Sequence, residues 1–571
     1  MRITTLALAI LSGTTIADES PSAAQLMPET TAFYVEIPNP SGLVSSIFDH
    51  PLRAKIESLE PYEQATKTPQ FAQFRTGLAF VEGVLGMKWR EAVRTVTANG
   101  IAIGFDPSSE AVLVAIQGED TGAMKALRDK ALQFAQLGPA DQLKQSTYRD
   151  LPVYRAGEAR FALVRNWLLL TNKADTGKAT IDRLLDGTAA GLDRNKLFQQ
   201  ARETQPPDAT AWAFLNLQFV RDVGAASDLF ADRPSDNPGV ELIAGGIQSV
   251  LQQTPWLTAS VRAGDDGLEA KFALPNNSEW IPEHREFYFG PKGGGRAPAL
   301  PFVKSPLFSI STYRNFSEMW LRAPDLFTDG VNDGMAQADA TLTQFFSGRD
   351  FGEEILGALT PEVCFIAARQ NFTDILPTPT IKLPHFALVM NLREPERMTR
   401  ELRRTFQSLI GFFNVIGAME GNPQLEMDIV KLDDAELITT AYIPDEDDAD
   451  SKTADLIYNF SPTVGFSGSR FVIASTDRFA REIIESSNEN DVTANSNTEL
   501  RLHGGVLQSV LRDNQEQLIA QNMLEEGNTR EEAEGEIALL LAALGFIKDT
   551  SITLTADQKE LALGFRISLE Q

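Results

Sequence analysis

The chain has 571 residues, of which 43% are hydrophobic, so it is too long for one core and has the apolar content of a folded protein. Its 78 acidic and 51 basic residues give a formal net charge of −27, which argues against nucleic acid or an anionic lipid surface as a partner. The single cysteine, Cys364, excludes an intrachain disulfide and a zinc site built from several thiolates.

The N-terminus predicts a secretory signal peptide. A short apolar run, Ile3 to Ile16, is followed by Asp18–Pro21, which ends any helix. The run is shorter than the roughly 20 apolar residues that a membrane-spanning helix needs, and no later segment has that character. Ala17 and Ala24 are the candidate cleavage positions, so residues 1–24 are assigned to the signal peptide. Export without disulfides indicates a periplasmic or secreted bacterial protein.

Segments with strand and helix patterns occur twice in the same order. In the first set the expected elements are strands at 32–37, 101–105 and 111–116, a helix around 124–131, a hairpin with a following helix at 160–185, a strand at 211–215 and a closing hairpin at 258–274. In the second set they are strands at 308–313, 363–367 and 385–391, a helix around 398–406, a hairpin with a following helix at 462–484, a strand at 500–503 and a closing hairpin at 551–567. This repetition predicts a tandem duplication.

Two details support the matching of the sets. The closing hairpins align without a gap, which places Leu268 on Leu561 and Phe272 on Phe565. The helices carry apolar residues at three- and four-residue spacing, so each is expected to lay one face on a sheet. One of them opens with a capping box, Thr529–Glu532.

The predicted fold class is α+β, with two tandem related domains, each a mainly antiparallel sheet with helices packed on it. The expected domains cover 29–275 and 305–571. The stretch 276–304 between them is rich in proline and glycine and is predicted to be a linker. Its aromatic residues, Phe287 to Phe289, are expected to tuck against one of the domains.

Few residues suggest chemistry, and we predict neither a catalytic residue nor a cofactor. Cys364 and His385 lie on neighbouring predicted strands, so a thiolate–imidazole pair is conceivable. The apolar neighbours of Cys364 instead favour a buried, inert thiol.

The densest acidic run is the other candidate site. Its carboxylates could hold Ca²⁺, with Asp445, Asp447, Asp448 and Asp450 as the candidate metal ligands. The run lacks the glycine and the distant glutamate of an EF-hand loop, so a solvated acidic loop is the preferred interpretation.

Three short segments resemble a known family: Met27–Val35 (MPETTAFYV), Tyr148–Tyr154 (YRDLPVY) and Trp167–Asn172 (WLLLTN). The chain resembles uncharacterised exported bacterial proteins, found especially in planctomycetes, that are described as a domain of unknown function. The resemblance implies export and an α+β repeat, and it implies no functional residue.

These patterns favour an exported cell-envelope protein with a non-enzymatic binding or structural role. Its partner would be an unknown envelope protein or ligand. The alternative is a carboxylate- or metal-dependent hydrolase of the envelope. A concave site holding several carboxylates would favour the enzyme, whereas an exposed apolar patch would favour a protein-binding role.

Overall fold

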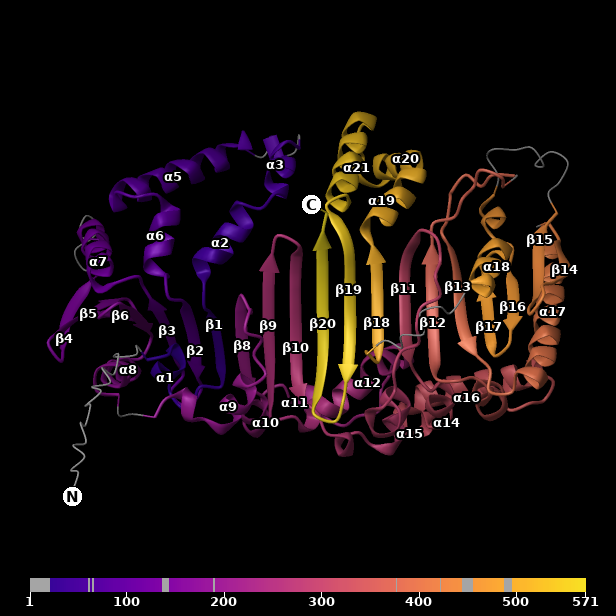
Figure 1. Ribbon diagram of the computed structural model, residues 1–571, viewed down its shortest axis with the longest axis horizontal. Coiled ribbons are helices and arrows are strands. Elements are labelled where there is room, and N and C mark those ends of the chain that lie inside the picture. Colours follow the sequence, from indigo (N-terminus) through magenta and orange to yellow (C-terminus); the bar gives the residue numbers. More distant parts are fainter. Residues whose placement is uncertain are drawn as a thin grey trace, which may run out of the picture. The chain divides into compact units, whose positions relative to one another are not determined.

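A computed structural model describes residues 21–570 except 60–61, 64–65, 136–142, 188–189, 376, 422, 444–454 and 487–494 (Figure 1). Most of the expected signal peptide and all of the acidic run at 445–450 therefore lie outside the described residues. The fold is α+β, and it divides into two compact units. Unit 1 comprises Met1–Ser41 and Val81–Glu203, and unit 2 comprises Gly42–Phe80 and Thr204–Gln571. These boundaries differ from those of the expected repeat domains, which stay a prediction.

Unit 1 is an antiparallel sheet in the strand order β1-β2-β3-β7-β6-β5-β4. Its strands are β1 (Phe33–Ile37), β2 (Ile101–Asp106), β3 (Ala111–Gln117), β4 (Lys144–Tyr148), β5 (Leu151–Ala156), β6 (Ala159–Val164) and β7 (Trp167–Thr171). Its helices are α1 (Ala23–Leu26), α6 (Trp89–Val96), α7 (Thr121–Ala135), α8 (Ala174–Asp186) and α9 (Lys196–Arg202). Helix α8 packs on β6 and β7 through Ile181 and Leu184, which are 3% exposed, as the predicted amphipathic pattern requires.

Unit 2 is built on a wider antiparallel sheet in the order β8-β9-β10-β20-β19-β18-β11-β12-β13-β17-β16-β15-β14. Its strands are β8 (Ala211–Asn216), β9 (Trp256–Gly264), β10 (Gly267–Pro275), β11 (Pro306–Tyr313), β12 (Glu362–Ala368), β13 (His385–Asn391), β14 (Leu425–Lys431), β15 (Glu436–Tyr442), β16 (Thr463–Ser467), β17 (Arg470–Ala474), β18 (Thr498–His503), β19 (Ile547–Ala556) and β20 (Glu560–Leu569).

Most helices of unit 2 gather near the ends of its strands (Figure 1). They are α10 (Leu217–Asp222), α11 (Ser227–Phe230), α12 (Pro238–Gln253), α13 (Glu286–Phe289), α14 (Phe316–Leu321), α15 (Ala323–Leu326), α16 (Asp329–Phe345), α17 (Pro395–Glu420), α18 (Asp477–Glu485), α19 (Gly504–Asp513), α20 (Gln515–Glu526) and α21 (Arg530–Leu544). The segment Gly42–Phe80 belongs to this unit and carries α3 (Leu52–Glu57) with most of α2 (Pro40–Phe48) and α5 (Pro69–Leu85).

The strand order of unit 1 recurs within unit 2. The run β1-β2-β3-β7-β6-β5-β4 has the same chain order as β11-β12-β13-β17-β16-β15-β14. In the middle of unit 2, β8-β9-β10 meets β20-β19-β18 edge to edge through the β10–β20 pair. Tandem duplication predicts this pattern, and overlay of the matched hairpins β6–β7 and β16–β17 would test it.

The predicted hairpins and their turns are confirmed. Arg165 and Gly468 occupy the first turn position of β6–β7 and β16–β17, with φ values of +55° and +56°. A φ in this region is expected at the tight turns that match the twist of hairpin strands. The capping box is confirmed as well, because the Thr529 hydroxyl accepts the Glu532 N–H and the Glu532 carboxylate accepts the Thr529 N–H.

The proline- and glycine-rich stretch 276–304, predicted to be a linker, lies within unit 2 and contributes aromatic residues to one of its core clusters. Phe287, Tyr288 and Phe289 are 0–2% exposed and join a cluster with residues of α12, α14, α15, β19 and β20. The aromatic residues thus pack as the sequence predicted.

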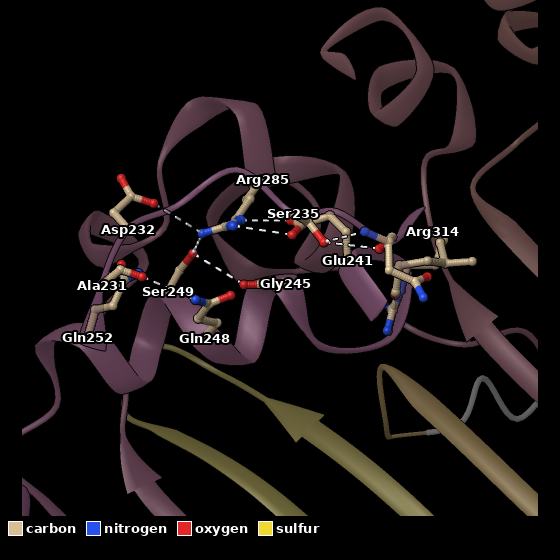
Figure 2. Close-up of polar contacts among 12 residues, drawn as sticks. Ala231, Asp232, Ser235, Glu241, Gly245, Gln248, Ser249, Gln252, Arg285 and Arg314 are labelled. Carbon is tan, nitrogen blue, oxygen red and sulfur yellow. Dashed lines mark hydrogen bonds and ion pairs between the residues drawn. The ribbon is translucent and has the colours of Figure 1, made fainter. Parts of the chain in front are cut away.

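A buried ion pair holds this stretch to α12 (Figure 2). The Arg285 Nε donates to Glu241 Oε1 at 2.7 Å and its Nη2 donates to Oε2 at 3.2 Å, while both side chains are 2% exposed. A third nitrogen, Nη1, donates to the Ser249 hydroxyl at 3.2 Å and lies 3.6 Å from the exposed Asp232 carboxylate. The bidentate Arg285–Glu241 contact is the strong form of an arginine–carboxylate ion pair.

A second buried guanidinium, Arg314, joins four chain segments. It donates to the carbonyl oxygens of Leu242, Tyr288 and Tyr313 and to Asn497 Oδ1, at distances of 2.6–3.2 Å. Its charge also lies 3.5 Å from the centre of the Tyr288 ring. Burial lowers the pKa of Arg314 from its ordinary value, but arginine stays charged in proteins. Arg285 and Arg314 together fix the chain around residues 285–288. From there the chain continues to residues 297–306, which cross one face of the unit 2 sheet.

Candidate functional site

Residues 297–306 form a strap across one face of the unit 2 sheet. At its start, the Ala297 N–H donates to Ser496 O at 2.9 Å and Pro298 O accepts the Ser311 hydroxyl. At its end, the Lys304 N–H donates to the Glu482 carboxylate on α18. Leu300 and Val303 pack on the core under α18, whereas Phe302 is 78% exposed. The strap is therefore held at both ends.

An open cavity of about 1630 Å³ lies between the strap, the sheet and α18. This is larger than the usual 300–1,000 Å³ of small-molecule sites. On the sheet and α18 it is lined by Ser309, Cys364, Ile366, Val389 and Ile484. The last four are 1–8% exposed, because Leu300 and Val303 of the strap pack on the same core cluster. The cavity can therefore offer both apolar and polar contacts to one ligand.

Charged residues line the rest of the cavity: Glu362, Glu482 and Glu485 are acidic, and Lys304, Arg470, Arg478, Arg481 and Arg501 are basic. His503 also lines the cavity. Basic residues outnumber acidic ones here, although the whole chain has 51 basic and 78 acidic residues. The lining of the cavity thus carries two more basic than acidic residues in a protein that is acidic as a whole.

Several of these charges also have structural partners. Arg470 donates to the carbonyl oxygens of Ile483 and Ser486 at the end of α18, and this favours the helix C-terminus. Arg501 pairs with Glu499, and the nearest oxygen of Glu485 lies 3.9 Å from Arg481 Nη1. At 3.9 Å an exposed pair contributes little, so Arg481 can turn toward a ligand at small cost.

In unit 1 the chain before β1 packs closely on its sheet. Leu26 and Met27 are 0% exposed. Gly104 of β2 faces Met27. A Cβ added to Gly104 would lie 2.6 Å from the Met27 Sδ, so only glycine leaves room for the methionine side chain. The chain before the matched strand β11 is the strap, which leaves the large cavity. The segment before β1 thus fills its sheet face, whereas the segment before β11 leaves a cavity, so the cavity is specific to unit 2.

The opposite face of the unit 2 sheet is apolar and partly bare. Register places Leu268, Phe272, Ile567, Phe386 and Ile473 on this face, and they are 37–45% exposed. An alternating strand pattern usually means that the apolar face is covered. Here helices cover parts of it, at α17 and at the cluster around Phe287, and leave the rest open.

The structure keeps Cys364 and His385 apart. They lie on the adjacent strands β12 and β13, but Cys364 is opposite Val389 and His385 is opposite Ala368. Four residues along a strand correspond to about 13 Å, so no thiolate–imidazole pair forms. Burial raises the pKa of Cys364 to about 11 and lowers that of His385 to about 4. The preferred interpretation of Cys364 as a buried, inert thiol agrees with this geometry.

The structure does not test the other candidate site from the sequence. The acidic run with Asp445, Asp447, Asp448 and Asp450 lies outside the described residues. Within the ranges that the structure covers, no group of three or more His, Cys, Asp and Glu side chains is placed to hold a metal ion. No helix among the described residues is long and apolar enough to cross a membrane.

Sequence reasoning missed the cavity. Its basic residues come from the strap, the β16–β17 hairpin, α18 and β18, which are spread over some 200 positions of the chain. Arg470, Arg478 and Arg481 are close in sequence, but Asp477, Glu482 and Glu485 lie among and beside them, so this segment carries no net charge that could have served as a signal.

No protein-family model and no curated protein matches the chain. Three solved structures of a protein called TP0453 are similar to part of it. Crystal form IV is 10% identical, covers 44% of this chain and 79% of its own, and has a TM-score of 0.25. The values are 11%, 45%, 80% and 0.24 for form III, and 8%, 45%, 80% and 0.25 for form I. At this level the similarity supports no functional conclusion.

Proposed function

We propose that the protein is an exported, non-enzymatic binding protein of the cell envelope that holds an anionic amphiphilic ligand in the cavity beneath the strap. The observation that carries this proposal is the large open cavity with basic residues around it in a protein of net charge −27. A ligand without negative charge would gain nothing from this concentration of cations.

The lining also indicates the shape of the ligand. Ile366, Val389 and Ile484 line the apolar side of the cavity at 1–8% exposure, so a ligand would reach them by displacing Leu300 or Val303 of the strap, and Arg478 and Arg481 lie on the adjacent helix α18. A ligand with an apolar body and a negatively charged group would contact both at once. The negative group of the ligand would bind beside arginine and away from glutamate. This preference would fix the orientation of the ligand and make its binding specific.

Octyl phosphate is expected to bind the protein at least about tenfold more tightly than octyl glucoside, which has the same tail and an uncharged head. Changing both Arg478→Glu and Arg481→Glu should weaken octyl phosphate binding about tenfold or more, because the cations near its phosphate become anions. Isothermal titration calorimetry at low salt would measure both differences.

The matched control is the pair Arg400→Glu and Arg404→Glu on α17. It changes the net charge by the same amount and lies outside the cavity. Equal weakening by both pairs would mean that binding depends on overall charge, and the proposed site would be wrong.

The proposed export predicts a mature chain that starts near Asp18 rather than Gln25. Cleavage after Ala24 would cut α1, whose capping box joins Ser22 to Gln25 and whose Ala24 and Leu26 are buried. N-terminal sequencing of the protein from its native host should therefore give Asp18 or a close neighbour. Native material that still starts at Met1 would contradict export.

A further inference from the structure

The two closing hairpins of unit 2 differ in what covers their turn ends. In the second hairpin, β19–β20, Leu554, Ala556 and Leu561 are 2–5% exposed. They share one core cluster with residues of α14 and α15, namely Met319, Ala323 and Leu326. The two helices that follow β11 thus cover the turn end of this hairpin.

The matched end of the first hairpin, β9–β10, is not covered in this way. Leu268, which aligns with Leu561, is 45% exposed. Val261 and Ala263, at the positions of Leu554 and Ala556, are only partly buried. Equivalent apolar side chains are therefore buried in one hairpin and only partly covered in the other.

The helices that follow β1 have the complementary character. We call Gly42–Phe80 the arm. Several of its apolar side chains are exposed: Ile47 60%, Phe48 39%, Ile56 41%, Phe74 64% and Phe80 58%. Within the part of α5 that the structure describes, no residue is buried. The arm follows β1 in the chain as α14 and α15 follow β11, but several of its apolar side chains stay exposed.

The arm already touches the uncovered hairpin. His50 Nε2 lies 3.1 Å from Asp265 O in the β9–β10 turn, and His50 Nδ1 accepts the Leu52 N–H at the start of α3. Leu268 is three residues from Asp265. The arm is therefore in contact with the turn that precedes Leu268.

We propose that the arm docks on the turn end of the β9–β10 hairpin and covers Leu268, in the way that α14 and α15 cover Leu561. Docking removes two exposed apolar surfaces from water at once. Because the arm is tethered beside its target, its effective concentration there is high. A second copy of the chain is a poorer occupant, because two molecules of charge −27 repel each other.

The test is disulfide formation in the full chain carrying Ile47→Cys and Leu268→Cys, with copper–phenanthroline as oxidant. Cys364 is 2% exposed and should not compete. An intrachain disulfide is expected, seen as a monomer of altered mobility on a non-reducing gel. In the control, Ile47→Cys is paired with Glu269→Cys. Glu269 is next in sequence but points to the opposite face, where it pairs with Arg262, so this disulfide should form at least about tenfold more slowly.

A second measurement removes the apolar contact without cross-linking. Leu268→Cys alone should react slowly with a maleimide, and adding Ile47→Asp and Phe48→Asp should speed that reaction about tenfold. Equal disulfide rates in the two pairs, disulfides between chains alone, or a labelling rate unchanged by the aspartates would each overturn docking of the arm. The interchain result would identify a second copy as the occupant.

Discussion

Replacing Glu241 with leucine is expected to lower the free energy of unfolding by about 3–5 kcal/mol, because it leaves the buried Arg285 guanidinium without its carboxylate. Both side chains are 2% exposed, so water cannot replace the lost partner. The remaining carboxylate near Arg285, that of Asp232, is 3.6 Å away and 70% exposed, and it can compensate in part. Urea unfolding monitored by tryptophan fluorescence would measure the change.

Two controls separate the buried charge from a general effect of mutation. Adding Arg285→Met to the Glu241→Leu variant removes both charges and should restore much of the lost stability. Glu516→Gln removes one partner of a pair with Arg530 whose side chains are 71% and 58% exposed, and it should change stability by less than about 1 kcal/mol. If Glu241→Leu were as mild as Glu516→Gln, the ion pair would not be what holds residues 282–289 to α12.

His385 is expected to make the protein lose stability as the pH falls from about 6.5 to about 4. Burial lowers its pKa from 6.5 to about 4, and it stacks on Phe479 with ring centres 4.0 Å apart. Between these pH values the unfolded chain binds a proton on this residue and the folded chain does not, so acidification favours unfolding. Above about pH 6.5 the residue is neutral in both states and contributes no pH dependence.

The difference between the two pKa values corresponds to a loss of about 3 kcal/mol across this window. Measuring the unfolding free energy at several pH values for the natural chain and for His385→Phe would isolate it, since carboxylates titrate in both proteins. The phenylalanine variant should lose less stability on acidification by about this amount. Parallel curves for the two proteins would mean that His385 can take up its proton without unfolding.

Local patterns were sufficient to predict the α+β class, most strands and the order of the hairpins. Alternation of apolar and polar residues defines a strand within a few positions, as at 160–171, and the turn at Gly468 needs no distant partner. Matching the two sets of patterns also predicted which strands should be equivalent. The sequence signals of export, by contrast, concern residues that mostly lie outside the described structure.

The rest depended on contacts between residues far apart in the chain. Sequence could not show that the stretch 276–304 would enter the core, because its burial depends on Arg285 meeting Glu241, 44 residues away, and Arg314 meeting Asn497, 183 residues away. It also could not show that the strap would stand over a cavity, or that Leu268 would be bare while Leu561 is covered. An alternating pattern specifies which side chains share a face, but tertiary packing decides what covers that face.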